Sequence, residues 1–82
     1  MALDPADILT GLAKIITEET GIPAEQISAE QSFVDDLDID SLSMMTIITL
    51  AEDEFSVKIP DDVTPSLITV GDAVNFIAKA AN

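Results

Sequence analysis

The chain has 82 residues and a formal net charge of −13, with sixteen acidic residues against three lysines. So negative a protein repels phosphate backbones and anionic lipids, so nucleic acid and membrane surfaces are poor partners and basic protein surfaces are good ones. The alternative is that the acidity only keeps the protein soluble. No apolar run approaches the roughly 20 residues of a membrane span, and the first ten residues do not resemble a secretory leader. We expect one monomeric, cytoplasmic domain over residues 1–82.

The first predicted helix runs from about Pro5 to Thr20. Asp4 suits the N-cap, Pro5 suits the first helical position, and Gly21 suits the C-terminal stop. Apolar residues at helical spacing form one core stripe: Ile8, Leu12, Ile15 and Ile16. This segment therefore predicts an amphipathic helix.

Residues 21–40 predict a long connection with at most one helical turn, at 23–27. Its apolar residues are irregularly spaced, which indicates anchors that hold a loop against the core: Ile22, Ile27, Phe33 and Leu37. Connections of this length in small domains are often functional.

The second predicted helix runs from about Ser41 to Phe55, with Asp40 as its cap. One stripe has the spacing of a core face: Met44, Ile47, Ile48, Ala51 and Phe55. A second stripe is apolar near Ser41 and acidic farther along: Leu42, Met45, Thr49 and Glu52. From the residues alone, this second face either packs on another helix or is offered to partners.

The C-terminal part predicts one short and one regular helix. Pro65 interrupts residues 61–67, so a helix there is short or begins at the proline. Thr69 and Asp72 have capping-box spacing at the start of the last helix. Together these segments predict an all-α fold, a small antiparallel four-helix bundle with three main helices, one short irregular helix and a long first loop.

The composition argues against catalysis. The chain contains no His, Cys, Tyr or Trp, and general acid–base work and nucleophile activation usually depend on such groups. Catalysis by carboxylates alone would need a pocket, for which so small a domain has little interior. We expect a protein that is not an enzyme and has no catalytic residues.

The densest motif is FVDDLDIDSLSMM, residues 33–45. Asp36, Asp38 and Asp40 have the spacing that begins an EF-hand calcium loop, but Ser41 replaces the required glycine and Ile47 the required glutamate. We therefore expect no specific metal site, although clustered acids attract divalent cations weakly.

Ser41 stands at the start of the second helix, where backbone N–H groups and the helix dipole favour an anion. A phosphodiester on its oxygen would be held there without a basic side chain. The neighbouring aspartates oppose a free phosphate unless a divalent ion relieves the repulsion. On the residues alone, the favoured interpretation is a serine that merely follows a helix cap.

The chain resembles the acyl carrier proteins in DLDIDSLSMM, AEDEF, VKIPDD and TVGDAVNFI, motifs that together cover almost its whole length. The resemblance implies a carrier whose Ser41 holds 4'-phosphopantetheine in a phosphodiester bond. A phosphopantetheinyl transferase would install the group from coenzyme A with magnesium. The thiol of that arm would hold acyl chains as thioesters.

The resemblance also implies a partner-binding face, which maps to Asp40, Leu42, Met45, Glu52 and Asp53. Partners would be the transferase, a malonyl transferase, condensing enzymes, reductases and a dehydratase, all with basic docking patches. Many relatives carry acids where this chain has Ser43 and Thr46, and Pro65 falls where relatives often continue a short helix. An acyl chain would be sheltered by residues that could equally fill a closed core: Phe33, Met44, Ile47, Ile48, Phe55, Ile59 and Ile77.

The string DLDIDSLSMM most resembles free-standing, actinobacterial carriers of dissociated (type II) fatty acid synthesis. The alternative is a stand-alone carrier of a type II polyketide synthase. Peptidyl carriers usually have glycines where this chain has Asp38 and Ile39. An acidic interaction module without any modification is a third hypothesis, from a different functional class.

Overall fold

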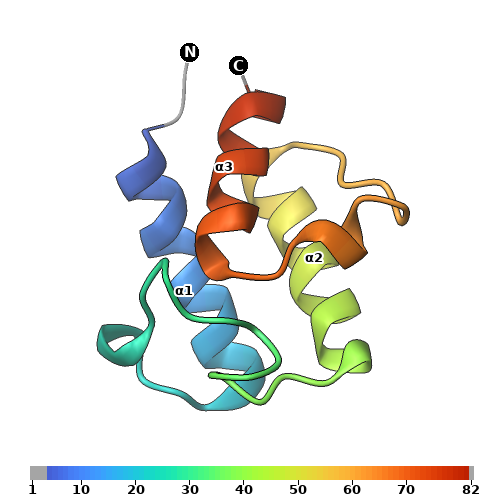
Figure 1. Ribbon diagram of the computed structural model, residues 1–82. Helices are drawn as coiled ribbons and strands as arrows, with labels where there is room; N and C mark the ends of the chain where they lie inside the picture. Colours follow the sequence, from blue (N-terminus) through green and yellow to red (C-terminus); the bar gives the residue numbers. More distant parts are fainter. Residues whose placement is uncertain (1–3, 82) are drawn as a thin grey trace.

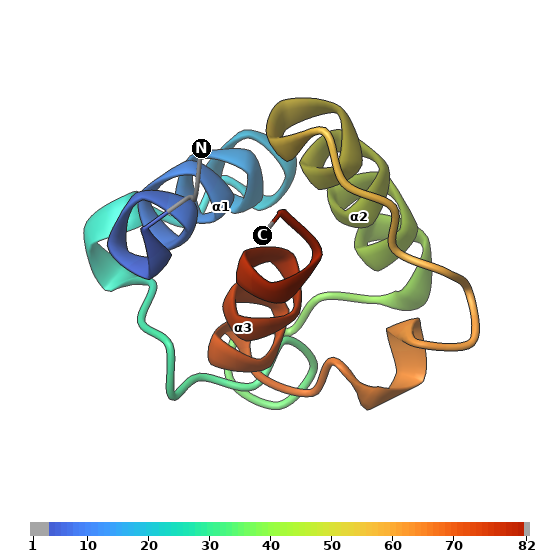
Figure 2. The ribbon, with the colours of Figure 1, turned by 90° about the horizontal axis from the view of Figure 1, so that it is seen from above.

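A computed structural model describes residues 4–81 and contains three α-helices joined by two long connections. Their bounds are α1 Pro5–Thr20, α2 Ser41–Phe55 and α3 Val70–Ala81, and two 3-10 turns, η1 (Ala24–Gln26) and η2 (Thr64–Ser66), lie between them. α1 runs antiparallel to both α2 and α3, and all three surround one core (Figures 1 and 2). The predicted all-α bundle is confirmed, and the irregular fourth helix is the single turn η2.

Local capping determines where the helices begin and end. The Asp4 carboxylate accepts a hydrogen bond of 3.2 Å from Ala6 N, and Gly21 closes α1 with a φ of 82°. At the start of α3, Thr69 and Asp72 bond reciprocally, each backbone N–H reaching the other side chain at 3.1 Å. The predicted caps are therefore confirmed, because these bonds depend on residues close in sequence.

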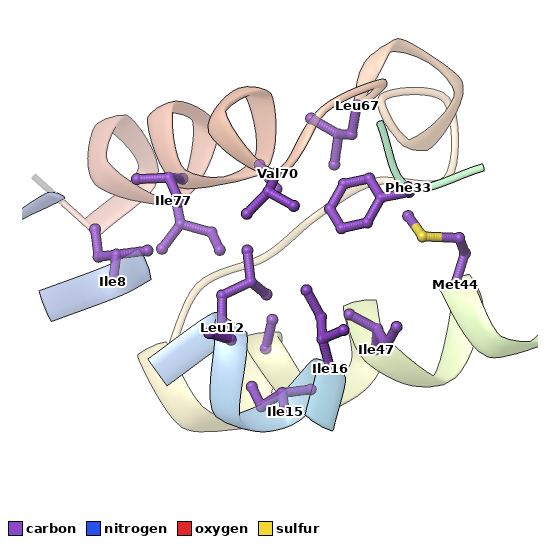
Figure 3. Packing of buried hydrophobic residues seen from close by; sticks show 14 of the residues in the cluster. Ile8, Leu12, Ile15, Ile16, Phe33, Met44, Ile47, Leu67, Val70 and Ile77 are labelled. Atoms are coloured by element: carbon purple, nitrogen blue, oxygen red, sulfur yellow. The ribbon is translucent and has the colours of Figure 1, made fainter. Parts of the chain in front are cut away.

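The long loop between α1 and α2 completes the core. Phe33 is only 2% exposed, and it lies between Leu67 and Met44 with its ring pointing toward Val70 (Figure 3). α1 packs on both other helices, and three buried loop residues belong to the same core: Phe33, Leu37 and Ile39. Among residues 4–81 no charged or polar residue is buried as a whole, although the Thr17 hydroxyl oxygen is enclosed without a hydrogen-bond partner.

Backbone hydrogen bonds fasten this loop to the start of α3. Phe33 N donates to Ile68 O at 3.0 Å, and Gly71 N donates to Ala29 O at 2.8 Å. Ser32 and Thr69 pair between them as an isolated antiparallel bridge. A Cβ atom at Gly71 would lie 3.0 Å from Ala29 O, so glycine permits the close approach of the two segments.

Candidate functional site

The start of α2 presents Ser41 to solvent. Asp40 is extended, and its Oδ1 accepts a hydrogen bond of 2.8 Å from Ser43 N, while its carbonyl accepts one of 2.9 Å from Met44 N. This cap makes Ser41 the first residue of the helix, with an exposed side chain. The N–H groups of a first helical turn have no partners within the helix and favour an anion nearby.

The loop that leads into α2 fixes the position of Ser41. Leu37 and Ile39 are buried. Asp38, which lies between them, and Asp40, which follows them, are exposed. Ile39 N donates to Phe33 O at 2.9 Å. Asp38 has a φ of 54°, a left-handed conformation that aspartate tolerates better than most residues. The serine thus stands on an anchored loop, next to the core.

The acids before Ser41 have separate local tasks. Asp36 Oδ2 accepts a hydrogen bond of 2.6 Å from Ser32 N, whereas the Asp40 carboxylate accepts one from Ser43 N. The Ser43 backbone N–H lowers the pKa of Asp40, with smaller contributions from the Ser43 hydroxyl and the Leu42 N–H, and slight desolvation opposes them. Within residues 4–81, no three acidic side chains form a group that could hold a metal ion.

An apolar hollow of about 460 Å³ lies beside Ser41. Three segments form its walls: the loop at 32–35 and 39, the start of α2, and the segment around η2. Its lining includes Ser41, Phe33, Met44, Val34, Met45, Leu67 and Ile68. A flexible arm attached at Ser41 would therefore have apolar surface within reach.

The residues that we expected to shelter an acyl chain are only partly brought together. Phe33 and Met44 line the hollow beside Ser41. Ile47 and Ile77 are instead enclosed in the core. Phe55 lies at the other end of the molecule, in a groove that also includes Gly11. The alternative of a closed core describes most of the set, because five of the seven side chains are buried members of the core: Phe33, Met44, Ile47, Ile59 and Ile77.

The predicted partner-binding residues fall into two groups. Asp40, Leu42, Met45 and Asp53 are exposed on or beside α2. Glu52 is half-buried, and its Oε2 accepts a hydrogen bond of 2.7 Å from Ile59 N. Glu52 therefore also holds the loop after α2, a contact across seven residues that no helical pattern indicates.

Sequence reasoning missed two exposed apolar residues near the serine. Val34 is 63% and Ile68 61% exposed, and both line the hollow beside Ser41. In FVDD and LITV an exposed apolar residue directly follows a buried one. The sequence pattern does not show that Phe33 and Leu67 are the buried residues and Val34 and Ile68 the exposed ones. Only the bridge between the two segments brings them to the same place.

Comparison with known proteins places this chain within a recognised family. Residues 10–77 match the family model described as a phosphopantetheine attachment site. An acyl carrier protein of Beutenbergia cavernae is 61% identical over 80 residues, 98% of each chain. One from Myxococcus xanthus is 58% identical over 74 residues, which are 90% of this chain and 94% of the other.

The fold agrees with a solved structure as well. The acyl carrier protein of Enterococcus faecalis superimposes with a TM-score of 0.79 at 35% sequence identity, covering 95% of this chain and 99% of the other. Among residues 4–81, no helix combines the length and hydrophobicity needed to cross a lipid bilayer.

Proposed function

Because this chain belongs to the acyl carrier proteins, which are carriers and not catalysts and bind 4'-phosphopantetheine covalently, we propose that the attachment point is the Ser41 hydroxyl. One observation carries this proposal: Ser41 is an exposed serine at the first position of a capped helix, within the matched residues 10–77. When attached, the group supplies the thiol that holds an acyl chain as a thioester.

The residues around Ser41 fit such a group. The first turn of α2 offers backbone N–H groups to phosphodiester oxygens, and the Asp40 cap keeps that turn formed. Because Ser41 is exposed, a transferase can reach its hydroxyl. The apolar hollow beside Ser41 can accept the uncharged part of an arm or cargo.

We propose that the carrier serves dissociated fatty acid synthesis in the cytoplasm. Its partners would then be a phosphopantetheinyl transferase, a malonyl transferase, condensing enzymes, reductases and a dehydratase. The likeness of DLDIDSLSMM to actinobacterial carriers supports this pathway. A type II polyketide synthase is the alternative pathway for the same chemistry.

The attachment is tested by incubating the protein with coenzyme A, magnesium and a broad-specificity phosphopantetheinyl transferase. Intact mass should rise by one phosphopantetheinyl group, and peptide mapping should place it on Ser41. Ser41→Ala should abolish the rise. Ser43→Ala, which removes a hydroxyl from the same helical turn, should be modified as the wild type is. Modification of another residue would overturn the assignment to Ser41, and no mass change would favour an acidic interaction module without the group.

The pathway needs a separate measurement. A malonyl-loaded protein should be elongated by a fatty-acid condensing enzyme in the presence of an acyl primer. A polyketide ketosynthase should use it much less well. The opposite preference would assign the carrier to polyketide assembly without affecting the attachment at Ser41.

A further inference from the structure

Two adjacent methionines on α2 lie in opposite environments. Met44 belongs to the core and is 8% exposed, and its side chain extends from α2 toward Phe33 (Figure 3). Met45 is 63% exposed. Because consecutive residues of an α-helix lie about 100° apart around its axis, Met45 faces solvent where Met44 faces the core. The two sulfur atoms therefore differ in their access to small molecules.

Met45 borders three depressions of the surface. It lines the apolar hollow beside Ser41, a shallow groove along α2 that includes Leu50, and a small space between α2 and Ile59. Methionine is unbranched and flexible, so a small solute reaches the Met45 sulfur from several directions. Met44 also contributes to the hollow, but the core covers most of its side chain.

The composition of the chain determines which oxidant would act on it. A net charge of −13 repels anionic oxidants and does not repel a neutral hydroperoxide. The chain has no cysteine, whose thiolate would compete for the oxidant, and no Trp or Tyr. Among the side chains of residues 4–81, the exposed methionine sulfur is therefore the group that a hydroperoxide oxidises most readily.

We propose that Met45 is a site of reversible oxidation by neutral hydroperoxides, and that its sulfoxide weakens the binding of uncharged apolar groups in the hollow beside Ser41. A sulfur lone pair attacks one peroxide oxygen, so an S–O bond forms and the O–O bond breaks. With hydrogen peroxide, the leaving hydroxide takes the proton of the transferred oxygen, which gives the sulfoxide and water. The sulfur loses two electrons and the peroxide gains them. The proposal does not depend on the attachment at Ser41.

The effect on the hollow follows from the polarity of a sulfoxide. Oxidation converts the apolar thioether of Met45 into a polar group, beside the exposed side chains of Val34 and Ile68. An uncharged apolar ligand would then displace water from a sulfoxide oxygen without replacing its hydrogen bonds. The fold should persist because Met45 is exposed, whereas a sulfoxide at Met44 would place an unpaired polar oxygen in the core.

Selective oxidation is tested by treating the folded protein with a small molar excess of hydrogen peroxide. Trypsin cleaves after Lys14, so the peptide with Met1 separates from the one that contains both other methionines. Met44→Leu keeps only Met45 in that second peptide, and Met45→Leu keeps only Met44. Mass spectrometry should show that Met45 gains one oxygen atom about fivefold faster than Met44, or more. Equal rates would overturn the proposal.

The effect on the hollow is measured with Nile red, a neutral apolar dye, titrated before and after oxidation. The oxidised wild type should bind the dye about threefold more weakly, or less well still. Methionine sulfoxide reductases that together accept both epimers should restore the affinity. Met45→Leu is the matched control and should bind the dye equally before and after peroxide treatment. Met45→Gln places a polar amide at the same position and should imitate the oxidised protein.

Three further results would overturn the effect on the hollow. They are an unchanged dye affinity after Met45 is oxidised, a reduced protein that binds no dye, and a peroxide effect that persists in Met45→Leu. Urea unfolding before and after treatment verifies that the fold is intact, since a loss of stability would place the damage at Met44. Attachment at Ser41 is measured separately by the mass gain, so either proposal can fail without the other.

Discussion

The Glu52 carboxylate closes the loop after α2 by accepting a hydrogen bond of 2.7 Å from the backbone N–H of Ile59. Ile59 itself is buried, so the bond ties a core residue of the connection to α2. Glu52 was expected from the sequence to face partners, and its half-buried side chain instead has a structural partner as well. Defects in partner binding at this position therefore need to be separated from loss of stability.

We predict that Glu52→Ala lowers the free energy of unfolding by about 1–3 kcal/mol, because the Ile59 N–H loses a charged acceptor. Glu52→Gln keeps an acceptor oxygen and should recover most of that loss. Urea unfolding followed by circular dichroism gives both values. Asp53→Ala is the matched control, since Asp53 is exposed and adjacent. Equal stability of Glu52→Ala and Asp53→Ala would contradict a structural role for Glu52.

Gly11 on α1 and Phe55 at the end of α2 provide a second test. A Cβ atom at Gly11 would lie 2.8 Å from Phe55 Cζ, so the half-buried ring must move. We expect Gly11→Ala alone to be nearly neutral, because a helix propensity gain of about 1 kcal/mol offsets the displaced ring. In a Phe55→Leu background, the same change should stabilise the protein by about 0.5–1 kcal/mol.

The double-mutant cycle measures this coupling directly from four urea unfolding curves. Strictly additive effects of Gly11→Ala and Phe55→Leu would show that the ring does not resist a methyl group at Gly11.

The Asp40 cap should make stability depend on pH in a defined direction. Its pKa in the folded protein is lowered from 3.8 because Ser43 N–H binds the carboxylate. A lowered pKa means that the stabilising contribution is complete above pH 3.8 and is lost as pH falls through the folded value. Asp40→Asn keeps an acceptor but does not titrate there, whereas Asp40→Ala removes the cap.

Denaturant midpoints measured from neutral pH down to pH about 3 should therefore rank Asp40→Ala lowest at neutral pH. The advantage of the wild type over Asp40→Asn should shrink in acid. An advantage that grows as the pH falls would contradict the lowered pKa.

The net charge of −13 should make the melting temperature rise with ionic strength. Added sodium chloride screens the mutual repulsion of the acids, and magnesium does so more effectively because it is divalent. Since no group of three acids within residues 4–81 could hold a metal, the rise with magnesium should be gradual. Saturation at a low, defined magnesium concentration would indicate a discrete site, and an unmoved melting curve would indicate that the acids are already neutralised.

The sequence by itself determined the helices and the position of Ser41. The capping residues bond backbone groups within four residues of themselves, so the local sequence is enough to predict them: Asp4, Gly21 and Asp40. For the same reason, the start of α2 and its exposed serine follow from a short motif.

Only the tertiary structure decided what surrounds that serine. Glu52 finds its partner Ile59 seven residues farther along the chain. Val34 lies near Ile68 because the backbone bond from Phe33 to Ile68 joins segments more than thirty residues apart. Such contacts form because burying Phe33 and Leu67 places their neighbours on the surface. The order of apolar residues in the sequence does not show which of two adjacent residues becomes buried when the chain packs.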